Sequence, residues 1–149
     1  MVGVEIDLIQ EDTLAALTLY EKIFEVERIE VTALPKGNNE AVFTIYGVRF
    51  HMLDENAELG MVAPKEGDPK PIWFNVLVPD IKATYEKAMW AGCTEVQPLM
   101  DMMEGSVTNA MFTDPYGYMW MLHQIHREVS FEDRLKMYEN MADKEDQAQ

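Results

Sequence analysis

The sequence predicts an α+β fold built from two copies of one βαβββ unit and completed by a C-terminal helix. Three observations in the 149-residue chain predict it. The order strand, helix and three strands occurs twice. A glycine, Gly47 or Gly117, precedes the last strand of each copy. An aspartate, Asp12 or Asp80, stands before each helix, where its side chain can cap the first turn.

The first unit is predicted over residues 1–55. Residues 4–10, VEIDLIQ, alternate apolar and polar side chains as a half-buried strand does. Residues 13–24 repeat large apolar side chains at helical spacing, which predicts an amphipathic helix. A further strand is expected over 26–35, and two more within 40–55. These elements make one complete βαβββ unit.

The second unit is predicted over residues 71–126. A linker, 56–70, precedes it, because that stretch mixes glycine, proline and charged residues without a sustained period. The unit opens with the apolar strand PIWFNVLV and a helix over 80–92, which Gly92 can end. TEVQPLM, GSVTNAMFTD and GYMWMLHQ then supply three strands.

The tail, residues 127–149, is predicted to form a helix with a frayed acidic end. Ser130 and Asp133 are placed as a capping box at its start. One apolar stripe follows, so we expect the helix to dock on a surface; its residues are Phe131, Leu135, Tyr138 and Ala142.

The charge of the chain limits its partners. Lys and Arg total 12 against 27 Asp and Glu, a formal net charge of −15. Such a surface repels phosphate backbones and anionic lipid heads, so we expect no nucleic-acid partner and no membrane partner. A neutral or cationic small ligand is compatible with it, although the acidity can also serve solubility alone.

Cysteine content and the first residues bear on the compartment. The single cysteine, Cys93, excludes an intramolecular disulfide and a cysteine-rich zinc site. The opening MVGVEIDLIQ has no basic segment and no long apolar core, so no signal peptide is expected. No apolar run approaches the roughly 18 residues of a membrane span. We therefore expect a cytoplasmic protein.

Two stretches, FTDPYGYMWML (112–122) and WFNVLVPDIKATYEK (73–87), carry a resemblance to a known family. Together with the doubled unit they resemble the vicinal oxygen chelate superfamily. That superfamily includes glyoxalase I, bleomycin-resistance proteins, fosfomycin-resistance enzymes and extradiol dioxygenases. The stretch GVRFHMLDE and the S-F-E-D start of the tail helix look closest to its phosphonate-operon-associated, demethylubiquinone-methyltransferase-like branch.

The resemblance implies a curved mixed sheet that forms a cup, with the helices on its outer face. In the superfamily up to four equivalent cup positions hold a metal, and here they read Glu5, His51, Trp73 and Met121. Strand alternation places five further side chains beside them in the cup: Asp7, Arg49, Asn75, Met119 and His123.

This set of residues is poor in metal ligands. Glu5 and His51 can ligate a divalent metal, whereas an indole cannot and a thioether is too soft. Asp7 is the candidate third ligand, although strand spacing separates it from Glu5 by roughly 6–7 Å. We therefore expect a cup without a metal, and a divalent metal held by Glu5 and His51 is the alternative.

The polar residues of the cup allow two interpretations. Arg49 can pair with Glu5 or Asp7 and simply fill the cup. Alternatively, a few polar groups among apolar walls form a small-molecule site, with Trp73 as a stacking surface and methionines as a deformable floor. His51 is the candidate general base, or a hydrogen-bonding residue of the wall.

The preferred function is a small-molecule-binding protein of this superfamily that binds or sequesters a neutral or cationic organic ligand in the cup. The alternatives are a metal-dependent lyase, isomerase or dioxygenase, an enzyme that uses His51 without a metal, and a structural role for the tail helix. The resemblance also implies a homodimer, with each cup completed within one chain or across two. Whether a reaction is catalysed stays open at this point.

Overall fold

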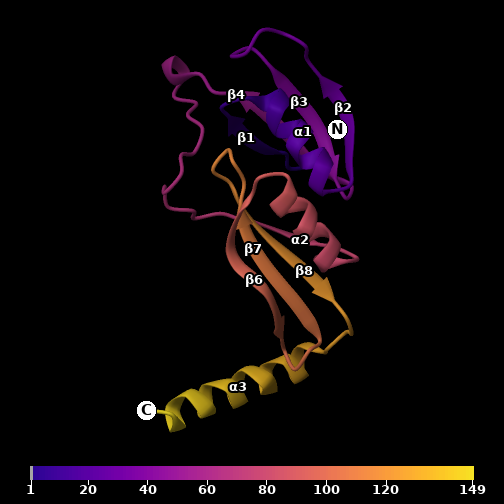
Figure 1. The fold of residues 1–149 in the computed structure, drawn as a ribbon, viewed down its shortest axis with the longest axis vertical. Coiled ribbons are helices and arrows are strands. Elements are labelled where there is room, and N and C mark those ends of the chain that lie inside the picture. The colour runs from indigo at the N-terminus through magenta and orange to yellow at the C-terminus, as the bar shows by residue number, and fades with distance from the viewer. Residues whose placement is uncertain (1) are drawn as a thin grey trace.

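The computed structural model describes residues 2–149 and contains the doubled unit (Figure 1). The first unit comprises β1 (Ile6–Gln10), α1 (Thr13–Ile23), β2 (Val26–Val31), β3 (Glu40–Ile45) and β4 (Val48–Asp54). The second comprises β5 (Phe74–Leu77), α2 (Ile81–Trp90), β6 (Thr94–Met102), β7 (Val107–Thr113) and β8 (Met119–Ile125). A short 3-10 helix, η1 (Ala57–Leu59), lies between the units, and α3 (Phe131–Gln147) follows them.

Each unit forms one four-stranded mixed sheet. The strand orders are β1-β4-β3-β2 and β5-β8-β7-β6. In both sheets the first and last strands of the unit pair in parallel, and the remaining neighbours pair antiparallel. The predicted α+β fold of paired βαβββ units with a C-terminal helix is therefore confirmed.

Local capping explains where the two sheet-covering helices begin. The Asp12 side chain accepts a hydrogen bond from the backbone N–H of Ala15, and Asp80 accepts one from Ala83, each at 3.1 Å. Each bond satisfies a donor that the first helical turn leaves unpaired. The two aspartates thus do the same work at equivalent places of the repeat.

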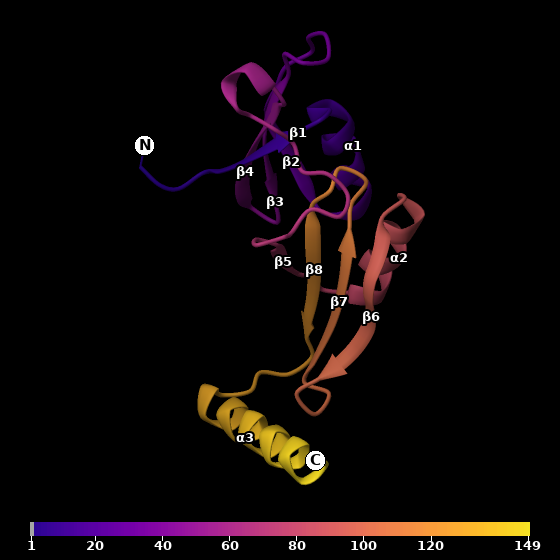
Figure 2. The ribbon, with the colours of Figure 1, turned by 90° about the vertical axis from the view of Figure 1, so that its left-hand side faces the viewer.

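The core lies between the helices and one face of each sheet. In the first sheet Leu8, Phe43 and Phe50 are buried beneath α1. In the second, Phe112 and Leu122 are fully buried on the side that α2 covers. Figure 2 shows α2 alongside β6 and β7. The opposite face of each sheet, called the cup face below, carries no helix of its own unit.

The two units share one core. The Trp120 ring of β8 lies 5.1 Å from the Tyr20 ring of α1 and 5.2 Å from the Phe24 ring, measured between centroids. The Tyr118 hydroxyl donates a hydrogen bond of 2.7 Å to the carbonyl oxygen of Ile9 in β1. These contacts fix the units against each other.

Helix α3 stands apart from both sheets, at the far end of the molecule from the first unit (Figures 1 and 2). Ser130 caps it, accepting from the N–H of Asp133 as predicted. None of its described residues is buried, and Phe131, Leu135 and Tyr138 are exposed. Within one chain, the stripe that we expected to dock lies open. No helix formed by residues 2–149 is long and apolar enough to cross a membrane.

Candidate ligand or metal site on the cup face

The parallel pair β1 and β4 positions the polar residues of the first sheet. Asp7 is the register partner of His51, and Ile6 is the partner of Phe50. Since side chains alternate along a strand, Asp7 and His51 share the cup face, while Leu8 and Phe50 enter the core. The face assignment made from the sequence therefore agrees with the observed burial.

His51 lies among three carboxylates. Its Nδ1 is 3.4 Å from a carboxylate oxygen of Glu5 and 3.5 Å from one of Asp7. Its Nε2 is 3.1 Å from a carboxylate oxygen of Glu40. The His51 side chain is 17% exposed, whereas those of Asp7 and Glu40 are each 55% exposed. The His51 ring is thus less exposed than the Asp7 and Glu40 carboxylates beside it.

Arg49 forms an ion pair with Glu5. The hydrogen bond from the Arg49 guanidinium, assisted by its charge, holds the pKa of the Glu5 carboxyl below its ordinary value. This pair is the arrangement that fills the cup without any ligand. Both side chains are partly exposed, so water can compete with each partner for the other.

Glu5, Asp7 and His51 fit a divalent metal in part. One ligand atom from each lies within 4.8 Å of the others. The separation of Glu5 and Asp7 that we expected from strand spacing is thus overcome by their side chains, which both turn toward His51. One nitrogen and two carboxylate oxygens suit ions such as Mn²⁺ or Zn²⁺. Arg49 competes with such an ion for Glu5.

The second sheet contributes amide and thioether side chains to the cup face. Asn75 on β5 is the register partner of Met121 on β8, and Met121 in turn faces Met111 on β7. Met119 lies two residues before Met121 on the same face. The Met121 position therefore lies beside an amide and two further thioethers.

Trp73 precedes β5 and opens onto a cavity of about 420 Å³ at the junction of the two units. Asn75 and Leu77 line the same cavity from β5, and Tyr46 and Val48 line it from the first unit. Asn75 is its only amide side chain, and no charged residue lines it. The structure thus brings Trp73 and Asn75 together against apolar walls, and groups Glu5, Asp7, Arg49 and His51 around a separate polar centre.

His123 lies further along β8, opposite Asn109 of β7. Burial lowers the pKa of the His123 imidazole, so the ring is neutral near pH 7. Its Nδ1 and the amide oxygen of Asn109 are buried without a hydrogen-bond partner among residues 2–149.

Glu40 is a residue that sequence reasoning missed. Glu40 is the first residue of the stretch predicted as strands, 40–55, and it is absent from the predicted cup residues. In the structure Glu40 begins β3, where Ala41, Phe43 and Ile45 enter the core. Strict alternation from those three buried positions would have placed Glu40 on the cup face.

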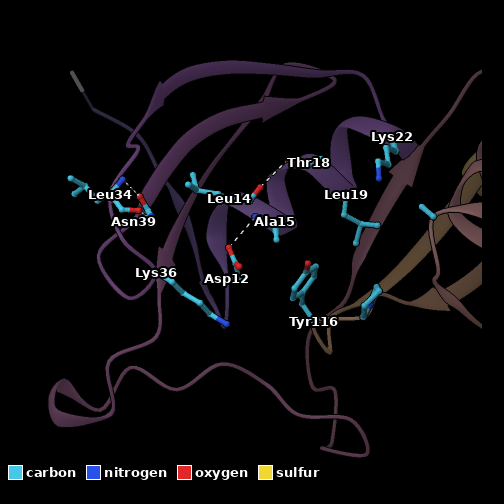
Figure 3. Close-up of a pocket in the computed structure, with 12 residues that line it drawn as sticks. Asp12, Leu14, Ala15, Thr18, Leu19, Lys22, Leu34, Lys36, Asn39 and Tyr116 are labelled. Carbon is cyan, nitrogen blue, oxygen red and sulfur yellow. Dashed lines mark hydrogen bonds between the residues drawn. The ribbon is translucent and has the colours of Figure 1, made fainter.

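A larger cavity, of about 630 Å³, lies outside the cup along α1 (Figure 3). Its polar groups serve the local fold: Asp12 caps the helix, and the Thr18 hydroxyl donates to the Leu14 carbonyl oxygen. Lys22 and Lys36 lie toward opposite ends of the helix. This trough offers little convergent chemistry, so the cup face is the better candidate site.

Comparison with known proteins identifies the class to which this fold and site belong. The family model of the Glyoxalase/Bleomycin resistance protein/Dioxygenase superfamily matches residues 4–122. The chain therefore belongs to that superfamily. It is also 26% identical over 130 residues to uncharacterised proteins of Mycobacterium bovis and Mycobacterium tuberculosis. The match covers 85% of this chain and 85% and 76% of those proteins, respectively.

Solved structures share the fold. One is a mutant of FosX, a fosfomycin resistance protein from Listeria monocytogenes, complexed with Mn(II) and 1S,2S-dihydroxypropylphosphonic acid. It superposes with a TM-score of 0.63 at 21% identity and covers 93% of this chain and 98% of its own. TioX from Micromonospora sp. ML1 superposes with a TM-score of 0.61 at 18% identity, covering 87% and 100%. At these low identities, the superpositions show a shared fold and do not show a shared activity.

Proposed function

We propose that the chain is a small-molecule-binding protein of this superfamily, which binds or sequesters a neutral or cationic organic ligand without a metal. The observation that carries the proposal is the position of His51 among Glu5, Asp7 and Glu40. Three carboxylates oppose one guanidinium there, so the centre keeps net negative charge even when His51 is protonated. A cationic group is the natural counter-charge.

The apolar junction cavity, which no residue of the His51 centre lines, is a second place that suits the same class of ligand. The flat indole of Trp73 and the ring of Tyr46 both line it, with the Asn75 amide as the polar group. Aromatic faces attract cations and stack on planar ligands. An organic cation with an aromatic or aliphatic body therefore matches the chemistry of both places better than an anion does.

A second function is favoured by the convergence of Glu5, Asp7 and His51 within 4.8 Å. In this alternative these three residues hold a divalent ion, and the protein is a lyase, isomerase or dioxygenase. A bound ion would act as a Lewis acid on a substrate oxygen. Mn(II) is present in the FosX complex named above. Neither Trp73 nor Met121 would add a ligand for such a hard ion.

Thermal melting separates the two functions. Metal-stripped protein is melted alone, with Mn²⁺, Ni²⁺, Zn²⁺ or Mg²⁺, and with a panel of aromatic and aliphatic ammonium compounds. We expect organic cations to stabilise the protein and metals to leave it unchanged. A ligand at about a hundred times its dissociation constant adds roughly 2.7 kcal/mol, which is several degrees for a chain of this size.

The controls use His51→Ala and His126→Ala. Both remove an imidazole, but the His126 ring bonds to Thr108 in the second sheet and is not part of the His51 centre. We expect His51→Ala to abolish the stabilisation by organic cations and His126→Ala to keep it. A rise with one metal that disappears in His51→Ala would instead establish the metal-dependent function.

We further propose a homodimer. β5 is an edge strand of its sheet, and its Leu77 side chain is 57% exposed beside Trp73, which is 49% exposed. An open edge with apolar side chains is readily covered by a second copy.

Light scattering after size exclusion tests this assembly. The protein should elute at twice the monomer mass, and Leu77→Glu should shift it to the monomer by burying a charge in the contact. Leu59→Glu is the matched control, because Leu59 is 73% exposed on η1. A monomeric wild-type protein would contradict the proposal, as would equal behaviour of the two variants.

Within the superfamily we place the chain nearest the phosphonate-operon-associated, demethylubiquinone-methyltransferase-like branch. The support is the GVRFHMLDE strand, which carries Arg49 and His51, and the capped helix that begins after Ser130. A sequence tree that groups the chain with another branch would overturn this placement.

A further inference from the structure

A cavity of about 300 Å³ lies between the end of the second sheet and the start of α3. Ser106, Val107 and the His123 ring line it from the sheet. Arg127 lines it from the segment after β8, and Arg134 lines it from the first turn and a half of α3. No residue of the His51 centre lines this cavity, so its chemistry is independent of the function proposed above.

The two arginines of this cavity differ from the other two in the chain. Arg28 pairs with Glu21, and Arg49 pairs with Glu5. Neither Arg127 nor Arg134 forms an ion pair with any residue of the described range 2–149. Both residues are exposed, so their guanidinium groups are accessible to an anion that enters this cavity.

The wall of this cavity carries net positive charge. Glu128 is the one acidic residue among those that line it, against Arg127 and Arg134. The Ser106 hydroxyl is already used, since it donates to the Met103 carbonyl oxygen at 2.7 Å. The two guanidinium groups are therefore the charged donors that the wall offers to an anion.

Both arginines extend from fixed backbone. The Arg127 N–H donates to the Ser106 carbonyl oxygen, which ties the segment to the sheet. Arg134 lies within α3, and its guanidinium carbon is 5.7 Å from the centre of the Phe131 ring. One residue belongs to the sheet side and one to the helix side, so a group bound by both would join α3 to the sheet. That connection matters because no residue of α3 is buried.

We propose that this cavity binds a small oxyanion, a carboxylate or a phosphate-type group, through Arg127 and Arg134. A guanidinium presents two parallel N–H donors that match the paired oxygens of either anion. The bound anion bridges the second sheet and α3 and supplies the contact that the exposed stripe of the helix does not make.

Titration calorimetry with inorganic phosphate, methylphosphonate and acetate tests the site, with NaCl keeping the ionic strength constant. We expect saturable binding of at least one anion, and the strongest one identifies its class. Arg127→Gln and Arg134→Gln should each weaken binding at least tenfold. Lys144→Gln removes the same charge from the far end of α3 and should change it less than twofold. Absence of saturable binding, or equal losses in all three variants, would overturn the site.

A measurement on the wild-type protein removes any dependence on how the variants fold. Phenylglyoxal modifies accessible arginines, and peptide mapping reports each position separately. Phosphate should slow the modification of Arg127 and Arg134 and leave Arg28 and Arg49 unaffected. Equal protection of all four arginines, or protection of none, would contradict the proposal. Binding here with no organic cation bound at His51 would overturn the proposed function alone.

Discussion

Replacing Asp114 by alanine is expected to destabilise the fold by roughly 4 kcal/mol, because four donors lose one buried acceptor. One carboxylate oxygen accepts from the Tyr20 hydroxyl at 2.6 Å and from the Trp120 indole N–H at 2.9 Å. The other accepts from the backbone N–H groups of Tyr116 and Tyr118. Asp114 is 5% exposed, so the carboxylate and its hydrogen bonds are shielded from bulk water. Urea unfolding should show a lower midpoint with an unchanged slope.

Asp101→Ala is the matched control, since Asp101 is exposed and accepts one bond, from the Thr108 hydroxyl. It should cost about 1 kcal/mol or less. Asp114→Asn keeps the size of the side chain but turns one acceptor into a donor. The Tyr20 hydroxyl can rotate to accept from it, whereas the Trp120 N–H cannot. Equal midpoints for the Asp114 and Asp101 variants would refute this account.

The Asp114 carboxylate gives the D-P-Y-G turn a second role, which is to bond residues of both units. Burial raises the pKa of Asp114 above its ordinary value, although four hydrogen bonds favour the charged form. The residue bonds Tyr20 of the first unit as well as Trp120 of the second. The motif that suggested the family from the sequence thus holds the two units together.

The fold was predictable because its signals are local. The period of the apolar residues, the capping aspartates and the turn glycines each depend on a few neighbouring residues, and the doubled order repeats all of them. Alternation then assigned Asp7 and His51 to one face and Phe50 to the other, as the structure has them. Strand direction alone determines that assignment.

What the sequence could not provide depends on side-chain reach and on distant segments. Strand spacing separates Glu5 from Asp7, yet both side chains turn toward His51. The carboxylate of Glu40 reaches the other nitrogen of that ring from β3. Arg127 and Arg134 line one cavity because α3 begins next to the end of the second sheet. No periodicity encodes such convergence, which depends on the tertiary fold.

The turn before β8 carries the second large effect that we expect. Gly117 has φ of +91°, and a Cβ added there would lie 2.9 Å from the carbonyl oxygen of Pro64 and 3.1 Å from its carbon. Pro64 belongs to the connection between the units, so Gly117 is where that connection packs on the second unit. Gly117→Ala is expected to cost roughly 3 kcal/mol, from left-handed backbone strain and from displacing a backbone carbonyl.

Gly47→Ala separates these two causes, because the repeat supplies a matched position. Gly47 has φ of +80° in the corresponding turn of the first unit, and an added Cβ would meet no atom within 4 Å. Backbone strain alone should therefore cost about 1–2 kcal/mol at Gly47. The difference between the two variants in urea unfolding measures the contact with Pro64. Equal costs in the two variants would mean that Pro64 moves away from the added Cβ without a cost in stability. Asp114 and the Trp120 cluster would then be the contacts that fix the relative position of the two units.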